Sequence, residues 1–127
     1  MKILAISADD KLLNLVNSFA TEFEQHIFIY NQITKPIDIV GYAYEKNPSV
    51  IILDDDFVNP NAAVIIATLK KMKKNIEIIF FTSDTSIELG KQISPLGITY
   101  YAIKPIDKKE FSELLNSISE NKLKSTH

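Results

Sequence analysis

The sequence contains no cysteine and no arginine, since all 14 of its basic residues are lysine. Without cysteine there can be no disulfide, thiolate zinc site, iron–sulfur cluster or cysteine nucleophile. Without arginine the chain has no guanidinium fork to hold a phosphate or carboxylate through two hydrogen bonds. Three glycines and two histidines, His26 and His127, are too few for a glycine-rich nucleotide loop or a histidine metal cluster.

Charge of one sign and long apolar runs are also lacking. The 16 acidic and 14 basic residues leave a formal net charge of −2, so we expect no general attraction to nucleic acid or to an anionic membrane. No apolar run reaches the length of a membrane span, and residues 1–6 enter a strand pattern directly, unlike a signal peptide. We therefore expect a protein of the reducing cytoplasm that binds neither membrane nor nucleic acid directly.

Short apolar runs of buried-strand length alternate with amphipathic helical patterns along the 127 residues. The runs cover residues 3–6, 26–30, 50–53, 76–81 and 98–103. Continuous apolar strands separated by helices are typical of a parallel sheet covered on both faces. Right-handed crossovers and five strands favour an α/β fold with one doubly wound sheet, flavodoxin-like (βα)5, in the strand order 2-1-3-4-5. We assign residues 1–120 to this domain and residues 121–127 to a polar tail.

Several helix starts are marked by capping residues. The predicted starts are Asn59 with Pro60, Asp84 with Glu88, and Asp107 with Glu110. After Pro36, a further helix is expected to carry Ile37, Val40, Gly41 and Tyr44 on one face.

Polar side chains follow the strands at the edge where open parallel sheets bind ligands. Asp54 follows the third apolar run, Thr82 the fourth and Lys104 the fifth. A carboxylate nucleophile, a hydroxyl donor and an ammonium group that converge on one edge suit phosphoryl chemistry. Acidic residues also gather at strand ends simply because loops are solvated. The residues alone leave both interpretations open.

The pattern resembles the receiver domain of two-component response regulators over residues 2–118. The stretch that ends in Asp54 resembles the third strand of that family, and the stretch that ends in Thr82 and Ser83 resembles the fourth. Residues 97–106 resemble the fifth strand and its lysine–proline turn.

The resemblance implies a role for each matching residue. Asp54 would accept a phosphoryl group from a histidine kinase or a phosphotransfer protein, and Thr82 and Lys104 would contact that group. Tyr101 would be the aromatic residue whose rotation couples to it. The resemblance also implies a cis peptide bond between Lys104 and Pro105.

The sequence departs from the family after the first strand, where family members carry two acids that hold a magnesium ion. Without a gap, Ser7 and Ala8 stand at those positions, and a hydroxyl and a methyl group cannot replace two carboxylates around Mg²⁺. A shifted alignment would give the metal to Asp9, Asp10, Asp54 and Asp56, but it would lengthen a strand-to-helix loop that is normally short. The resemblance thus implies Mg²⁺, while these positions argue against it.

Three functions therefore stay open. The first is a receiver domain of a phosphorelay, which is phosphorylated on Asp54 and switches a partner-binding face without catalysing turnover of a substrate. The second is a degenerate receiver that binds proteins without phosphorylation. The third, a flavodoxin-like cofactor binder, is disfavoured because Asp9 and Asp10 would repel its phosphate.

The resemblance places the partner-binding face on the fourth helix, fifth strand and fifth helix, which could also form a receiver-type homodimer. Pro95 near the end of the fourth helix removes a hydrogen-bond donor and can truncate that helix, which would alter this face. Ordinary variation of a helix end is the alternative.

A basic run covers residues 70–74 and is interrupted by Met72. It could contact nucleic acid or acidic partners. Because lysines at the end of a helix interact favourably with its dipole, we expect a solvated helix end with Met72 turned toward the core. Tyr42 and Tyr44 are expected to pack beside the sheet with their hydroxyl groups in water.

Overall fold

The computed structural model describes the backbone of residues 1–125 and the side chains of residues 1–120. Five parallel strands form one sheet in the order β2-β1-β3-β4-β5. They are β1 (Lys2–Ile6), β2 (His26–Tyr30), β3 (Val50–Asp54), β4 (Glu77–Thr82) and β5 (Tyr100–Ile103). The helices are α1 (Asp10–Glu22), α2 (Pro36–Lys46), α3 (Asp55–Val58), α4 (Ala62–Met72), α5 (Ile87–Ile93) and α6 (Lys108–Ser125), with a 3-10 turn at Ser94–Leu96. The predicted doubly wound fold and strand order are confirmed.

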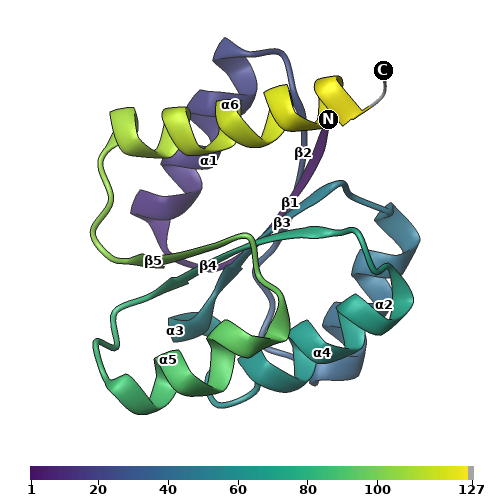
Figure 1. The fold of residues 1–127 in the computed structure, drawn as a ribbon, viewed down its shortest axis with the longest axis vertical. Coiled ribbons are helices and arrows are strands. Elements are labelled where there is room, and N and C mark those ends of the chain that lie inside the picture. Colours follow the sequence, from purple (N-terminus) through teal and green to yellow (C-terminus); the bar gives the residue numbers. More distant parts are fainter. Residues whose placement is uncertain (126–127) are drawn as a thin grey trace.

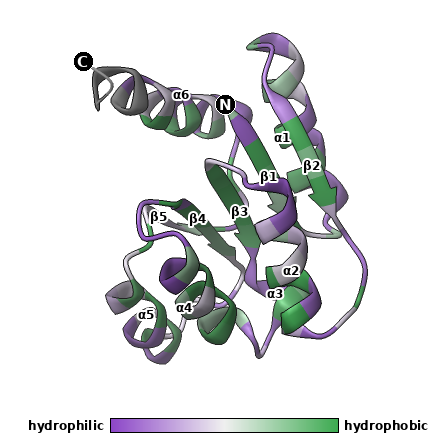
Figure 2. Ribbon diagram, turned by 90° about the vertical axis from the view of Figure 1, so that its right-hand side faces the viewer, coloured by the Kyte–Doolittle hydropathy of each residue, from purple (hydrophilic) through white to green (hydrophobic). Residues whose placement is uncertain are grey.

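Helices cover both faces of the sheet. Figure 1 shows α1 and α6 on one face and α2, α4 and α5 on the other. Side chains alternate along each strand, so Leu4 and Ile6 join the core under α2 and α4, while Ile3 and Ala5 join the core under α1 and α6. The middle of β1 and most of β3 are hydrophobic in Figure 2, as expected for strands buried on both faces.

The one-turn helix α3 shifts the predicted start of the following helix. The backbone N–H of Asn59 donates to the carbonyl of Asp55, so Asn59 closes α3 instead of capping α4. The next helix begins at Ala62, with Asn61 as its N-cap residue, and the predicted start at Asn59 and Pro60 is wrong. Because α3 is additional, the fourth and fifth helices of the sequence prediction are α5 and α6.

The two later helix starts differ in outcome. Asp107 caps α6 as predicted, since its Oδ1 accepts a hydrogen bond from the N–H of Glu110 at 2.8 Å. The predicted cap at Asp84 is wrong. Ser86 is the N-cap of α5, and its Oγ accepts from the N–H of Leu89 at 3.3 Å. Asp84 instead accepts from the N–H of Ser86.

The helix before Pro95 is short, as expected if Pro95 truncates it. Helix α5 has seven residues, and the 3-10 turn that contains Pro95 follows it directly. Gly97 then takes a left-handed conformation with φ of 81°, which glycine adopts without steric cost. Helix α5 therefore contributes about two turns to the face formed by α5, β5 and α6.

The C-terminal helix α6 continues to Ser125, so residues 121–125, expected as part of a polar tail, are helical. Residues 126 and 127 lie outside the described part of the chain. Among the described residues, no helix has the length and hydrophobicity needed to cross a membrane.

Candidate functional site

The register of the sheet brings the ends of three strands together. Ile6 of β1 pairs with Leu53 of β3, so the residues that follow them, Ser7 and Asp54, lie side by side. Strand β4 pairs with β3 on one side and with β5 on the other, which places Thr82 and the turn after β5 at the same edge. The carboxyl edge of the sheet is therefore the place where the predicted site residues meet.

Lys104 is the centre of this edge. Its Nζ lies 2.8 Å from Asp54 Oδ1, 2.9 Å from Asp9 Oδ2 and 3.1 Å from Asp56 Oδ2. The lysine side chain is only 14% exposed and that of Asp54 2%, so this pair is shielded from water, while Asp9 and Asp56 are partly exposed. Burial acts to lower the pKa of Lys104, but hydrogen bonds to Asp54 and Asp9 outweigh it and raise that pKa. The ammonium group is thus firmly charged. The expected cis bond between Lys104 and Pro105 is present.

Ser7 forms a hydrogen bond with the second carboxylate oxygen of Asp54. Its hydroxyl is fully buried and donates to Asp54 Oδ2 at 2.7 Å, while Ser7 Oγ accepts from the backbone N–H of Asp9 at 3.0 Å. Asp54 Oδ1 also accepts from the N–H of Asp56 at 3.1 Å. Both oxygens of the predicted phosphoacceptor are therefore held by groups of the protein itself.

Asp9 and Asp10 have different surroundings, although they are adjacent. Asp9 is the N-cap residue of α1, and its Oδ1 accepts from the N–H groups of Lys11 and Leu12. The hydrogen bond from Lys104, joined by these backbone donors, lowers the pKa of Asp9 although burial opposes it. Asp10 begins α1 and is exposed. Within the described residues, no salt bridge or hydrogen bond joins its carboxylate to Lys104.

Asp56 connects Lys104 to the loop after β4. Ser83 donates to it twice, from its hydroxyl at 2.6 Å and from its backbone N–H at 3.2 Å. Burial acts to raise the pKa of Asp56, but hydrogen bonds from Ser83 and Lys104 lower it overall. The carboxylate is therefore stabilised in its charged form.

Asp55 is a buried acid that is not among the site residues predicted from the sequence. It is 3% exposed, and Thr82 Oγ1 donates to its Oδ2 at 2.8 Å. Burial is the largest cause that raises the pKa of Asp55, and the hydrogen bond from Thr82 opposes it. The predicted switch hydroxyl is thus directed to Asp55, one residue beyond Asp54.

Tyr101 lies next to this pair. Its ring packs on Phe80, with the ring centroids 4.9 Å apart. Burial and then the charges of Asp55 and Asp84 raise the pKa of Tyr101. The predicted coupling of Tyr101 to Thr82 stays a prediction.

We expect the variant Asp55→Asn to be more stable than the wild type at pH 7. The folded-state pKa of Asp55 lies above the unfolded value near 3.8, so stability is lost as the pH rises from that value through the folded pKa. Asparagine keeps an acceptor for the Thr82 hydroxyl and cannot ionise. The gain in the free energy of unfolding is about 1 kcal/mol, the common size of a single-residue effect.

Urea unfolding of both proteins between pH 3 and pH 8 measures this difference, with Glu45→Gln as a control at an exposed acid. The gain disappears near pH 3, where Asp55 is protonated in both states. A gain that is the same at every pH, or a loss at pH 7, contradicts the assignment.

Asp55 and Ser7 belong to the site, although the residue pattern assigns neither of them a role there. Asp54, Asp55 and Asp56 are three identical letters, and only the geometry shows that they face Lys104, Thr82 and Ser83 respectively. The alternation of side chains past a strand end was the available signal for separating Asp55 from its neighbours. Ser7 was noted as a departure from the family, but its hydrogen bond to Asp54 was not predicted.

Comparison with known structures identifies the fold, while no protein-family model matches the sequence. The chain is similar to the CheY-like response regulator receiver domain protein from Methanospirillum hungatei JF-1, with 15% identity, a TM-score of 0.78 and coverage of 98% of this chain and 97% of that one. It is also similar to the BeF3-activated DrrB receiver domain (17% identity, TM-score 0.76, coverage of 94% and 97%). A third similar structure is HP1043, an orphan response regulator of H. pylori (14% identity, TM-score 0.75, coverage of 94% and 94%).

These likenesses cover nearly the whole of each chain. The protein has the fold of a response regulator receiver domain, as the sequence resemblance predicts. At identities of 14 to 17% the likeness concerns the fold, and the chemistry of the site depends on this chain's own residues.

Proposed function

We propose that this protein is a receiver-type signalling module that binds a partner protein without magnesium and without phosphorylation of Asp54. One observation carries the proposal. Ser7 stands where the family has a metal-binding acid, and its buried hydroxyl holds Asp54 Oδ2 while Lys104 holds Oδ1. An aspartate with both oxygens engaged and almost no exposed surface is a poor nucleophile toward an incoming phosphoryl donor.

The residues at the carboxyl edge do not fit a magnesium ion. Mg²⁺ requires oxygen ligands in near-octahedral geometry and is usually held by one or two carboxylates together with water. Here the oxygens of Asp9 and Asp56 accept hydrogen bonds from backbone groups, Ser83 and Lys104. In the part of the chain that the structure describes, no three acidic or histidine side chains are placed to share a metal ion.

Lys104 supplies the positive charge that a metal would otherwise bring to this edge. Its ammonium group balances part of the charge of three carboxylates, and it is covalently fixed and always present. In the proposed function the edge is therefore a structural network that fixes the loops after β1, β3 and β5, and no phosphoryl group is needed to order it.

The phosphorelay receiver is the second candidate function. It is favoured by the meeting of Asp54, Thr82 and Lys104 at one edge, with Lys104 Nζ only 2.8 Å from Asp54. In that function a histidine kinase or phosphotransfer protein would phosphorylate Asp54, and Ser7 would have to release the oxygen that it holds.

A titration with Mg²⁺ and beryllium fluoride, a mimic of the acyl phosphate, separates the two functions. Amide spectra of labelled wild-type protein are followed, and a second sample is incubated with acetyl phosphate before its intact mass is measured. We expect no saturable shifts near Asp54, Thr82 or Lys104 and no added phosphoryl group. Saturable shifts that need Mg²⁺ and disappear in Asp54→Asn would overturn the proposal and establish the phosphorelay receiver.

A further inference from the structure

A hollow lies at the end of the sheet opposite to Asp54. It has a volume of about 520 Å³ and lies between the C-terminal turns of α2 and α4. Pro48, which precedes β3, and Ile76, which precedes β4, belong to its lining. We call this hollow the amino-edge groove, because it lies where β3 and β4 begin. Asp54 ends β3, so the length of that strand separates the groove from the Lys104 network.

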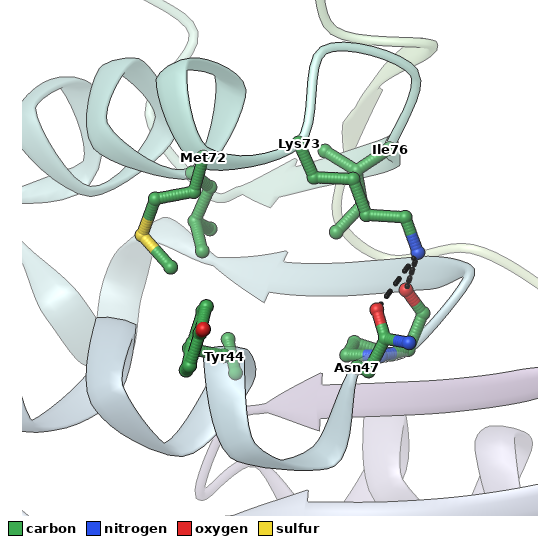
Figure 3. Close-up of a pocket in the computed structure, with 8 residues that line it drawn as sticks. Tyr44, Asn47, Met72, Lys73 and Ile76 are labelled. Atoms are coloured by element: carbon green, nitrogen blue, oxygen red, sulfur yellow. Dashed lines mark hydrogen bonds between the residues drawn. The ribbon is translucent and has the colours of Figure 1, made fainter.

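The amino-edge groove exposes two large side chains that the sequence analysis places elsewhere. Met72 is 43% exposed and Tyr44 74%, and in Figure 3 they face each other across the pocket from α4 and α2. The expectation that Met72 turns toward the core is wrong. The expected apolar face of α2 is right for Val40 but wrong for Ile37 and Tyr44, since Ile39, Val40 and Ala43 are its buried residues.

The two differences have separate reasons, the rotational position of α2 and the end of α4. Helix α2 buries the stripe of Ile39, Val40 and Ala43, so Tyr44 is turned away from the sheet. Helix α4 buries Ile65, Ile66 and Leu69 and ends at Met72, whose side chain lines the groove. Methionine and tyrosine are enriched in protein interfaces, where flexible and amphipathic side chains adapt to a partner.

Lysines are frequent in the two segments that form the groove, and Lys73 lines it. Segments 43–48 and 69–77 contain five lysines (46, 70, 71, 73 and 74) and two glutamates. Lys73 Nζ donates to Asn47 Oδ1 and to the carbonyl of Pro48, at 3.1 Å each, and Figure 3 shows it spanning one end of the pocket. Its partners are neutral oxygens, so its charge is not cancelled. Within the described residues, every salt bridge involves Lys104.

We propose that the amino-edge groove binds an acidic segment of a partner protein through one bulky apolar side chain. That side chain would lie between Tyr44 and Met72, and its acidic neighbours would contact Lys71, Lys73 and Lys74. The occupant follows from charge complementarity, because an apolar anchor flanked by carboxylates matches an apolar groove that Lys73 lines and that the exposed Lys71 and Lys74 adjoin in the sequence. The inference rests on the proposed function in treating the chain as a binding module, and it concerns the opposite edge of the sheet.

A peptide titration tests this proposal directly. The probe is a short capped peptide of glutamate and aspartate residues with one central phenylalanine, added to labelled protein at low and at high salt. We expect saturable shifts at Tyr44, Asn47, Met72 and Lys73 that weaken with salt. A peptide with serine in place of phenylalanine should bind at least tenfold more weakly, which corresponds to about 1.4 kcal/mol.

Matched variants locate the binding. Lys71→Glu combined with Lys74→Glu, and separately Met72→Ser, should each weaken the peptide at least tenfold. Lys108→Glu with Lys109→Glu, at exposed positions at the start of α6, should change it by less than about twofold, since charges beyond a Debye length are screened. The proposal is overturned if both double lysine variants lose the same affinity for the peptide, or if the peptide shifts amide signals centred on Asp54.

Two further outcomes also overturn it. If a single-stranded oligonucleotide binds at the same residues more tightly than the peptide, the lysines of the groove form a nucleic-acid surface instead. Self-association that is lost in the variant Lys71→Glu with Lys74→Glu makes a second copy the occupant. The variant Asp54→Asn should bind the peptide like the wild type. Phosphorylation of Asp54 and absence of peptide binding at the groove can therefore be observed independently.

Discussion

Replacement of Lys104 by methionine should lower the free energy of unfolding by about 3 kcal/mol at pH 7. The lysine is 14% exposed and contacts three carboxylates. Methionine has similar length but leaves those carboxylates without a counter-charge, and water reaches Asp54, which is 2% exposed, only poorly. Removal of one partner from a buried ionic network is much more destabilising than loss of a surface pair. Urea unfolding at pH 7 measures the effect.

The loss should depend on pH in a defined direction. The folded-state pKa values of Asp9 and Asp56 are lowered from 3.8, so the stability they contribute is present above that value and is lost as the pH falls through the folded values. The pKa of Lys104 is raised from 10.5, so its contribution is present below 10.5 and is lost as the pH rises through the folded value. The difference between wild type and variant is therefore largest between about pH 4 and pH 10.

Lys109→Met is the control, because Lys109 is exposed on α6. It should change the free energy of unfolding by less than about 0.5 kcal/mol. A Lys104→Met protein as stable as this control, or a loss that persists unchanged at pH 3, would show that the three carboxylates do not depend on the ammonium group.

Introduction of two acids, Ser7→Asp together with Ala8→Asp, should make the stability of the protein depend on magnesium. Ser7 is fully buried beside Asp54, so an aspartate there adds a like charge at a shielded position. Without metal the free energy of unfolding should fall by about 3 kcal/mol. Mg²⁺ at a hundredfold excess over its Kd should return about 2.7 kcal/mol through linkage.

The matched control carries asparagine at both positions, which adds similar bulk without charge. Neither the control nor the wild type should gain stability from Mg²⁺ when the ionic strength is held constant with NaCl. If the wild type gains as much as the aspartate variant, the proposal of a metal-independent module is wrong. If the aspartate variant gains nothing, the carboxyl edge cannot form a metal site even with both acids restored.

The sheet could be predicted from the sequence because its signal is local and redundant. Each strand is an unbroken apolar run between polar turns, and the cap at Asp107 has its acidic partner three residues later. The failures occur where two neighbouring residues compete for one role. Ser86 caps α5 in place of Asp84, and Asn59 closes an additional turn that the triple aspartate begins. Composition does not distinguish such alternatives, because the choice depends on backbone hydrogen bonds.

The site could be predicted only in its position. Asp54, Thr82 and Lys104 follow strands, and parallel strands bring their ends to one edge. Which oxygen faces which donor depends on side-chain directions past the strand ends, so the pairs of Ser7 with Asp54 and Thr82 with Asp55 could not be derived. The groove was missed for a related reason. Met72 and Tyr44 are apolar enough to suit a core, and only the rotation of α2 and the position of Met72 at the end of α4 leave them exposed.

The separation of charge between the two ends of the sheet has a consequence for how the molecule meets other molecules. Its net charge of −2 is small, but the aspartates gather at one end of the sheet and the lysines of α4 at the other. The protein is therefore an electric dipole, and a charged partner rotates it before contact, so encounters begin at the end of opposite sign. An acidic partner thus approaches the groove first. This orientation weakens as added salt shortens the range of the field.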